Sequence, residues 1–138
     1  MDVPVNYLAI VLAALSSMVT GTIWYAPKLF GGQFERLTGA NPNKPRKPAR
    51  TYILAFVASL LTAYVLAYSS FLAFARFDSA FILNALVTAF FLWLGFTAAR
   101  VLVHESFESR DLRIFFITSA YELVTVLVMA LIIGAFAV

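Results

Sequence analysis

The chain lacks the residues on which several kinds of site depend. Its 138 residues include no cysteine and a single histidine. The absence of cysteine excludes disulfide frameworks, thiolate nucleophiles and cysteine-ligated zinc or iron–sulfur sites. One histidine also excludes a multi-histidine metal site within one chain. We therefore expect no cofactor and no resident metal.

Charge is also scarce. Charged residues make up 12% of the chain, where about 25% is usual in a soluble domain, and hydrophobic residues make up 62%. This composition excludes an ordinary soluble domain and predicts an integral membrane protein. A net charge of +3 would suggest nucleic acid as the partner of a soluble chain. Here the basic residues flank apolar windows, so we expect no nucleic acid and interpret them as a topology signal.

Four apolar windows are long enough to cross a bilayer, whose hydrocarbon core of roughly 30 Å needs about 20 helical residues. The fold class is therefore predicted to be an all-α membrane protein with four transmembrane helices in two hairpins. The four helices fill most of the chain, so residues 1–138 form a single transmembrane domain. Their expected bounds are about 4–26, 51–75, 79–103 and 112–137, with a basic loop at 27–50.

The basic residues also indicate how the helices are threaded. Nine of the ten Lys and Arg residues lie in the loops 27–50 and 100–113, and only Arg76 lies at the other end of the helices. Basic residues near helix ends stay in the cytoplasm. We therefore expect both loops to be cytoplasmic and both termini to be outside.

The first basic loop has two parts. Phe30, Phe34 and Leu37 recur at helical spacing before Gly39, which predicts a short interfacial helix that ends at the glycine. The proline-rich stretch 41–48 cannot be helical and predicts an extended linker. Basic side chains there should contact anionic lipid headgroups, each contributing about 1 kcal/mol. These residues are Lys44, Arg46, Lys47 and Arg50.

The segment 21–31, GTIWYAPKLFG, resembles the signature of the domain-of-unknown-function family 1761, which comprises small bacterial membrane proteins. The second half of the chain adds WLGF at 93–96, FE at 107–108 and AY at 120–121, in the order found in that family. The resemblance covers almost the whole chain and implies a multi-pass protein of the bacterial cytoplasmic (inner) membrane. Since the family has no assigned activity, the resemblance implies no catalytic or binding residues.

Glu122 is the strongest candidate for chemistry. It lies about 15 Å into the last predicted helix, near the bilayer centre. A carboxylate there costs several kcal/mol, so it should face the bundle interior or a neighbouring protein. It could serve as a proton relay, a cation site or the counter-ion of a basic ligand. Alternatively, it is a protonated group that joins helices through a hydroxyl or amide, such as that of Thr20, Thr62, Tyr64, Asn84 or Thr88.

Other residues extend this hypothetical site or provide alternatives to it. We group Tyr121, Asn84 and Tyr64 with Glu122 as an intramembrane polar binding site, although Asn84 is also typical of interhelical hydrogen bonding, worth about 0.6 kcal/mol. Trp24 and Tyr25 fall at a predicted helix end, where aromatic rings anchor at the headgroup level.

The segment 104–108, HESFE, resembles the zinc-binding pattern His-Glu-x-x-His but has Glu108 in place of the second histidine. Catalytic zinc normally has three protein ligands. We therefore predict a solvated loop, in which Ser109 or Asp111 caps the last helix. No set of catalytic residues is visible.

Small residues recur every four positions on three of the predicted helices, which allows helices to approach closely. They are Ala13, Ser17 and Gly21, then Gly95 and Ala99, then Ala130 and Gly134. Four helices forming one compact bundle need fewer such contacts. We therefore predict a homo-oligomer.

Three classes of function fit these patterns. The favoured class is a small oligomeric transporter or channel with Glu122 as its intramembrane ionisable site. The alternative is a structural or accessory membrane protein that binds lipid or a partner protein. The third is an intramembrane enzyme, in which Glu122 with Tyr121 or Tyr64 transfers protons, although no nucleophile–base arrangement supports it. Whether the chain is an enzyme stays open, with the non-enzyme classes favoured.

Overall fold

The computed structural model describes residues 3–39 and 47–136, and within these ranges its regular elements are all helices. Four helical spans are long and apolar enough to cross a membrane. They are α1 (Tyr7–Trp24), α3 (Ala49–Arg76), the span Phe81–Phe107 and α6 (Leu112–Ala135). These spans confirm the predicted all-α membrane protein with four transmembrane helices.

The third span is not a uniform α-helix. It consists of α4 (Phe81–Leu92), a π-helix η1 (Trp93–Ala98) and α5 (Ala99–Phe107). π-Helical turns are rare and occur frequently at functional sites. The sequence had predicted an uninterrupted helix here, since no proline marks the change in hydrogen bonding.

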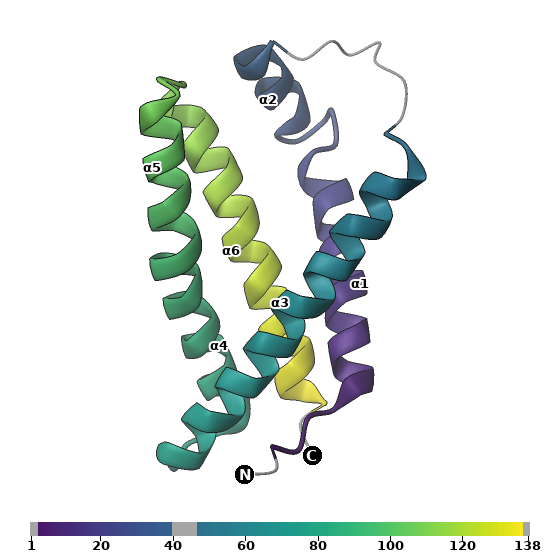
Figure 1. Ribbon diagram of the computed structural model, residues 1–138, viewed down its shortest axis with the longest axis vertical. Helices are drawn as coiled ribbons and strands as arrows, with labels where there is room; N and C mark the ends of the chain where they lie inside the picture. The colour runs from purple at the N-terminus through teal and green to yellow at the C-terminus, as the bar shows by residue number, and fades with distance from the viewer. Residues whose placement is uncertain (1–2, 40–46, 137–138) are drawn as a thin grey trace.

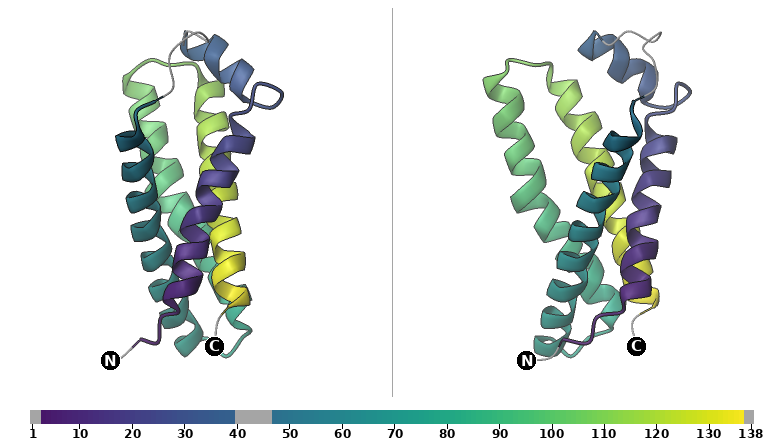
Figure 2. Two further views of the ribbon diagram at one scale, coloured as in Figure 1. Left: turned by 90° about the vertical axis from the view of Figure 1, so that its right-hand side faces the viewer. Right: turned by 45° about the vertical axis from the view of Figure 1, so that its right-hand side comes forward.

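The four spans form an antiparallel bundle (Figure 1). α1 packs against α3 and α6, and α4 packs against the same two helices, which closes the ring. The N-terminal and C-terminal segments lie together at what we call the termini end (Figure 2). The short helix α2 (Gly31–Thr38) and the turn between α5 and α6 lie at the opposite end, the loop end.

The half of the bundle near the termini end is closely packed, because small side chains let the helix backbones approach. Gly134 of α6 lies so near α4 that a Cβ there would be 2.7 Å from Cγ1 of Ile82. At the very end, Nδ2 of Asn6 donates to the Phe136 carbonyl at 2.8 Å. The buried core comprises Ile10, Ala13, Ala63, Leu66, Ala67, Ala85, Ala89, Met129, Ala130 and Ile133.

The spans separate in the half near the loop end. α3 packs against α4, whereas α5, which continues directly from η1, packs against α6. As a result α3 and α5 diverge toward the loop end, as Figure 1 and the right-hand view of Figure 2 show. The bundle is therefore closed at one end and splayed at the other.

Helix α2 confirms the predicted short helix and its glycine stop. Gly39 follows α2 with a φ of 69°, the left-handed conformation common after a helix. Gly31 begins α2 at a point where a Cβ would collide with the carbonyl oxygen of Tyr25. Glycine is therefore required for the tight connection between α1 and α2.

The capping of the last helix was also predicted correctly. Asp111 is the N-cap of α6, and its side chain accepts a hydrogen bond from the backbone N–H of Arg113 at 2.9 Å. Ser109 instead occupies the preceding turn with a φ of 53°. Residues 40–46 of the predicted linker, Lys44 and Arg46 among them, lie outside the described residues.

Candidate functional site

Glu122 lies on the interior face of α6. Residues at helical spacing from it share this face, and of these Thr125 and Met129 are buried while Val126 is half-buried. Glu122 itself is half-buried. We predicted that this carboxylate faces the bundle interior or a neighbouring protein, and the buried residues on its face of α6 favour the interior.

The expected hydrogen-bonding partners of Glu122 bond elsewhere. Thr20 donates to the carbonyl of Ser16 at 2.8 Å, and Thr62 donates to the carbonyl of Ala58 at 3.1 Å. Each bond stays within one helix. Among the residues that the structure describes, no hydrogen bond or ion pair involves the Glu122 carboxylate.

Asn84 does not join helices, contrary to the interhelical role expected of it. Its Nδ2 donates to the hydroxyl of Ser79 at 2.9 Å and to the carbonyl of Ala80 at 3.1 Å, so these bonds stay at the start of its own helix. Its neighbour Ile82 lies against Gly134. Glu122 is about 18 Å further along α6 than Gly134, which separates Asn84 from the carboxylate.

Tyr64 is also remote from Glu122. Its side chain is exposed on α3, where its ring stacks on that of Tyr68 with centroids 6.4 Å apart. By contrast, Ser59 on the inner face of α3 accepts a hydrogen bond at 2.8 Å from the hydroxyl of Ser17 on α1. The structure thus brings Tyr121 close to Glu122 but places Asn84 and Tyr64 elsewhere.

Tyr121 belongs to an aromatic cluster that the sequence did not predict. Its hydroxyl packs on Gly21, where a Cβ would be 3.0 Å from the oxygen, and its ring centroid lies 5.1 Å from that of Tyr25. Tyr25 in turn contacts Phe34 of α2 with centroids 5.2 Å apart, and Trp24 stacks on Phe30 at 4.4 Å. We call Trp24, Tyr25, Phe30, Phe34 and Tyr121 the aromatic junction.

The aromatic junction changes the interpretation of the residues that end α1. Trp24 and Tyr25 had been predicted to anchor at the headgroup level, but both are half-buried between α1, α2 and α6. Burial raises the pKa of Tyr25 to about 12, and the nearby Tyr121 and Glu122 side chains add to this effect while the Thr118 hydroxyl opposes it. Signals for this cluster were present in the sequence as the small Gly21 and the aromatic residues of α2.

A cavity of about 450 Å³ lies between α3 and the α4–η1 segment. Its walls are mainly apolar, with the hydroxyls of Thr62 and Thr97 and the indole of Trp93 as polar groups. Val126, one turn from Glu122 on the same face of α6, completes the lining. Glu122 itself is not a lining residue and lies one turn along α6 from Val126.

The π-helix holds Trp93 at this cavity. Its Nε1 donates to the carbonyl of Ser119 on α6 at 2.9 Å, which fixes the indole between η1 and α6. The Ser119 hydroxyl is buried and has no hydrogen-bond partner among the described residues. A buried polar group without a hydrogen-bond partner costs free energy. The Ser119 hydroxyl next to η1 is therefore a group that can still form a hydrogen bond.

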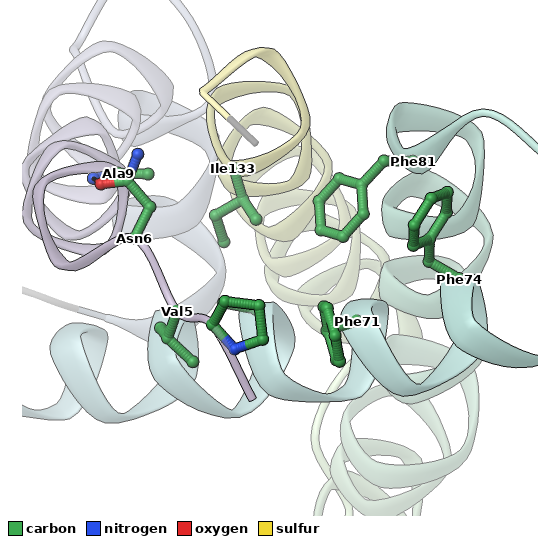
Figure 3. Close-up of a pocket in the computed structure, with 9 residues that line it drawn as sticks. Val5, Asn6, Ala9, Phe71, Phe74, Phe81 and Ile133 are labelled. Carbon is green, nitrogen blue, oxygen red and sulfur yellow. Dashed lines mark hydrogen bonds between the residues drawn. The ribbon is translucent and has the colours of Figure 1, made fainter. Parts of the chain in front are cut away.

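A second cavity, of about 210 Å³, lies at the termini end (Figure 3). Phe71 and Phe74 of α3 and Phe81 of α4 line it together with Ile133. Asn6 contributes a polar side chain, but no ionisable residue lines this cavity. The residues that line the cavity between α3 and the α4–η1 segment likewise include no ionisable side chain.

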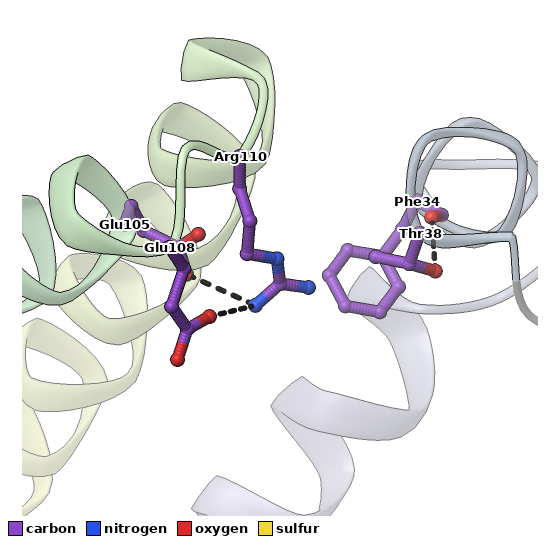
Figure 4. Close-up of polar contacts among 5 residues, drawn as sticks. All are labelled: Phe34, Thr38, Glu105, Glu108 and Arg110. Atoms are coloured by element: carbon purple, nitrogen blue, oxygen red, sulfur yellow. Dashed lines mark hydrogen bonds and ion pairs between the residues drawn. The ribbon is translucent and has the colours of Figure 1, made fainter.

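At the loop end, Arg110 joins two carboxylates (Figure 4). Its Nη1 lies 3.3 Å from Oε1 of Glu105 and 3.6 Å from Oε2 of Glu108, and its guanidinium points toward the ring of Phe34. Arg100 of α5 is exposed, so its long side chain is able to extend toward the headgroups.

The His104 segment forms no candidate metal site in the described part of the chain, where no group of three or more His, Asp or Glu side chains could hold an ion. Of the four basic residues predicted to contact lipid headgroups, the structure describes Lys47 and Arg50. They lie before and at the start of α3, at the loop end. Their contact with lipid headgroups stays a prediction.

Comparison with known proteins adds a family but no activity. A family model described as "Protein of unknown function (DUF1761)" matches residues 8–134, nearly the whole chain. No curated protein and no solved structure matches. The predicted family resemblance is confirmed, and function must be inferred from the geometry.

Proposed function

Since the chain belongs to the DUF1761 family of proteins of unknown function, we propose from its geometry that it is a small transporter or channel. Glu122 is the site at which a proton or another cation binds. The observation that supports this most is a carboxylate inside a membrane span, on the interior face, with no bonding partner among the described residues. Ionisable residues in such positions typically mark ion or substrate pathways.

The splayed half of the bundle supports a route to this carboxylate. α3 and α5 diverge toward the loop end (Figure 1), and we infer that the carboxylate is reached from this end. The hydroxyl of Ser17 donates to that of Ser59, and the hydroxyl of Thr125 donates to the Tyr121 carbonyl, so the spans carry polar groups in their interior. The closely packed core beyond them acts as the barrier that a transporter must have on one side.

The assembly and location complete the proposal. The protein is a homo-oligomer in the bacterial inner membrane, with its loop end in the cytoplasm and the basic residues before α3 on anionic headgroups. The small-residue stripe of Gly95 and Ala99 is exposed, whereas the other two stripes are used within the chain. This exposed stripe is the surface on which copies would meet. Native mass spectrometry from mild detergent tests this point, and a strictly monomeric spectrum at all concentrations would contradict it.

An accessory protein is the second candidate. The alanine-rich core fills the termini half of the bundle, which favours a structural role over a continuous pathway. Under this alternative the cavity beside Glu122 holds lipid.

The decisive experiment measures ion flux in proteoliposomes. Wild-type protein with an enclosed pH-sensitive dye should dissipate an imposed proton or cation gradient. Glu122→Gln keeps the shape and hydrogen bonding of the side chain but removes its charge, so it should slow the flux by about tenfold or more. Glu108→Gln removes an exposed carboxylate of the loop and provides the matched control. Equal flux with Glu122→Gln would contradict the proposal.

A further inference from the structure

The cavity between α3 and η1 has the properties of a site for an apolar molecule that enters from the bilayer. Its walls include Leu61, Val65 and Leu92, with the rings of Trp93 and Phe96. The side chain of Phe96 is 77% exposed, so this residue stands at the mouth of the cavity rather than inside the bundle. A volume of about 450 Å³ is within the range of small-molecule sites.

A carboxyl group lies just beyond the lining of this cavity. Glu122 is one turn, about 6 Å along the helix axis, from the lining residue Val126 and on the same face of α6. An apolar molecule lying against Val126 can therefore place a polar end at the carboxylate. Charge complementarity requires that end to be cationic, and the aromatic rings of Trp93 and Phe96 also favour a cation over an anion.

We propose that this site binds a lipophilic cation, with its apolar body between α3 and η1 and its charge at Glu122. This inference rests on the proposed function, because it names the substrate class of the same carboxylate. A proton and the organic cation then compete for Glu122, so that binding of one releases the other. Such competition is the simplest physical basis for coupling their movements.

The charged surroundings of Glu122 are compatible with this competition. Tyr25 and Tyr121 are the titratable groups closest to it, and both are neutral at physiological pH. Helix α2 carries Glu35 and Arg36 nearer the loop end, and α5 carries Arg100, which is exposed. Along α3 the stretch 53–63 has no ionisable residue, and neither has η1.

The binding experiment uses the tryptophan of the site as its reporter. The chain has two tryptophans, so Trp24→Phe leaves Trp93 as the sole indole. Tetraphenylphosphonium and tetraphenylborate have the same shape and opposite charge. In detergent, the phosphonium should change Trp93 emission with saturation, whereas the borate should not. Lowering the pH should weaken phosphonium binding, because protons occupy Glu122.

Two variants separate charge from shape. In the Trp24→Phe background, Glu122→Gln should weaken phosphonium binding by about tenfold or more, whereas the loop variant Glu108→Gln should leave it unchanged. Val126→Phe keeps the carboxylate but fills the cavity, and should weaken binding as well. Thermal unfolding of each variant verifies that the fold is intact.

The outcomes distinguish this inference from the proposed function. Equal binding of phosphonium and borate, or binding unaffected by Glu122→Gln, would overturn the inference and identify the cavity as a lipid site. Absence of binding together with flux that depends on Glu122 would overturn the inference alone. Binding that depends on Glu122 without any flux would support the ligand class while contradicting transport.

Discussion

The two halves of the bundle use opposite packing strategies. In the half near the termini end, alanine and glycine bring four helices into close contact around an apolar core. In the half near the loop end, α3 and α5 diverge, and the interior face of α6 carries Tyr121, Glu122 and Thr125. Both halves belong to the same four spans, so the difference arises from which side chains occupy the inner positions.

This difference shows how a short membrane protein can accommodate a carboxylate. A close-packed interior would leave Glu122 without water or a partner, at a cost of several kcal/mol. The packed half, in which alanine and glycine bring the helices together, supplies stability to the four spans.

The largest expected effect concerns the side of the membrane on which each end of the bundle lies. Because the chain has no cysteine, single cysteines can be introduced without background labelling. An impermeant maleimide added outside intact cells should label Asp2→Cys and should not label Lys44→Cys. The reverse pattern would place the basic loop outside and refute the topology inferred from the positive charges.

Enlarging a core alanine should strongly destabilise the packed half. Ala63 is 0% exposed, so Ala63→Leu adds side-chain volume where no space exists and should cost about 1 to 3 kcal/mol. Ala55→Leu, at an exposed position of α3 in the loop half, is the control and should have little effect. Thermal stability monitored by size-exclusion chromatography in detergent measures both variants. Equal losses for the two would show that the halves do not differ in packing.

The contact between Gly21 and Tyr121 tests the boundary between the halves. A Cβ at Gly21 would be 3.0 Å from the Tyr121 hydroxyl, which is a tight contact with a side chain that has some freedom to move. Gly21→Ala should therefore cost about 1 kcal/mol, and Tyr121→Phe should restore much of it by removing the oxygen. A double-mutant cycle on thermal stability measures this coupling. Additive effects would mean that the hydroxyl is not the atom in conflict.

The sequence was sufficient to predict what depends on composition and local pattern. Long uncharged windows gave the four spans, Gly39 gave the end of α2, and Asp111 gave the cap of α6. The inward orientation of Glu122 followed from the energetic cost of exposing a carboxylate to lipid. Each of these depends on neighbouring residues or on the solvent, and not on which helices meet.

What the sequence could not predict depends on contacts between distant segments. Asn84 donates to Ser79 and Ala80 at the start of its own helix, a local alternative that competes with bonding across helices. Tyr64 lies outside because the inner face of α3 is occupied by Ser59 and Ala63. The aromatic junction and the π-helix arise from packing among α1, α2, α6 and the third span, so no short motif identifies them.

The smallest expected effect concerns the turn that begins α6 at the loop end. Hydrogen bonds from Arg113 lower the pKa of the Asp111 carboxyl below its ordinary value. Because the folded-state pKa is depressed, this stabilisation is present above the unfolded pKa of about 3.9 and is lost as the pH falls through the folded pKa. Asp111→Ala should therefore slightly lower the melting temperature at neutral pH, and its difference from the wild type should disappear in strong acid. Asp78→Ala, in the turn at the termini end, should show no such pH-dependent difference, since Asp78 forms no side-chain hydrogen bond or ion pair within the described part of the chain. A difference that persists unchanged at low pH would show that Asp111 stabilises α6 by its shape rather than by its charge.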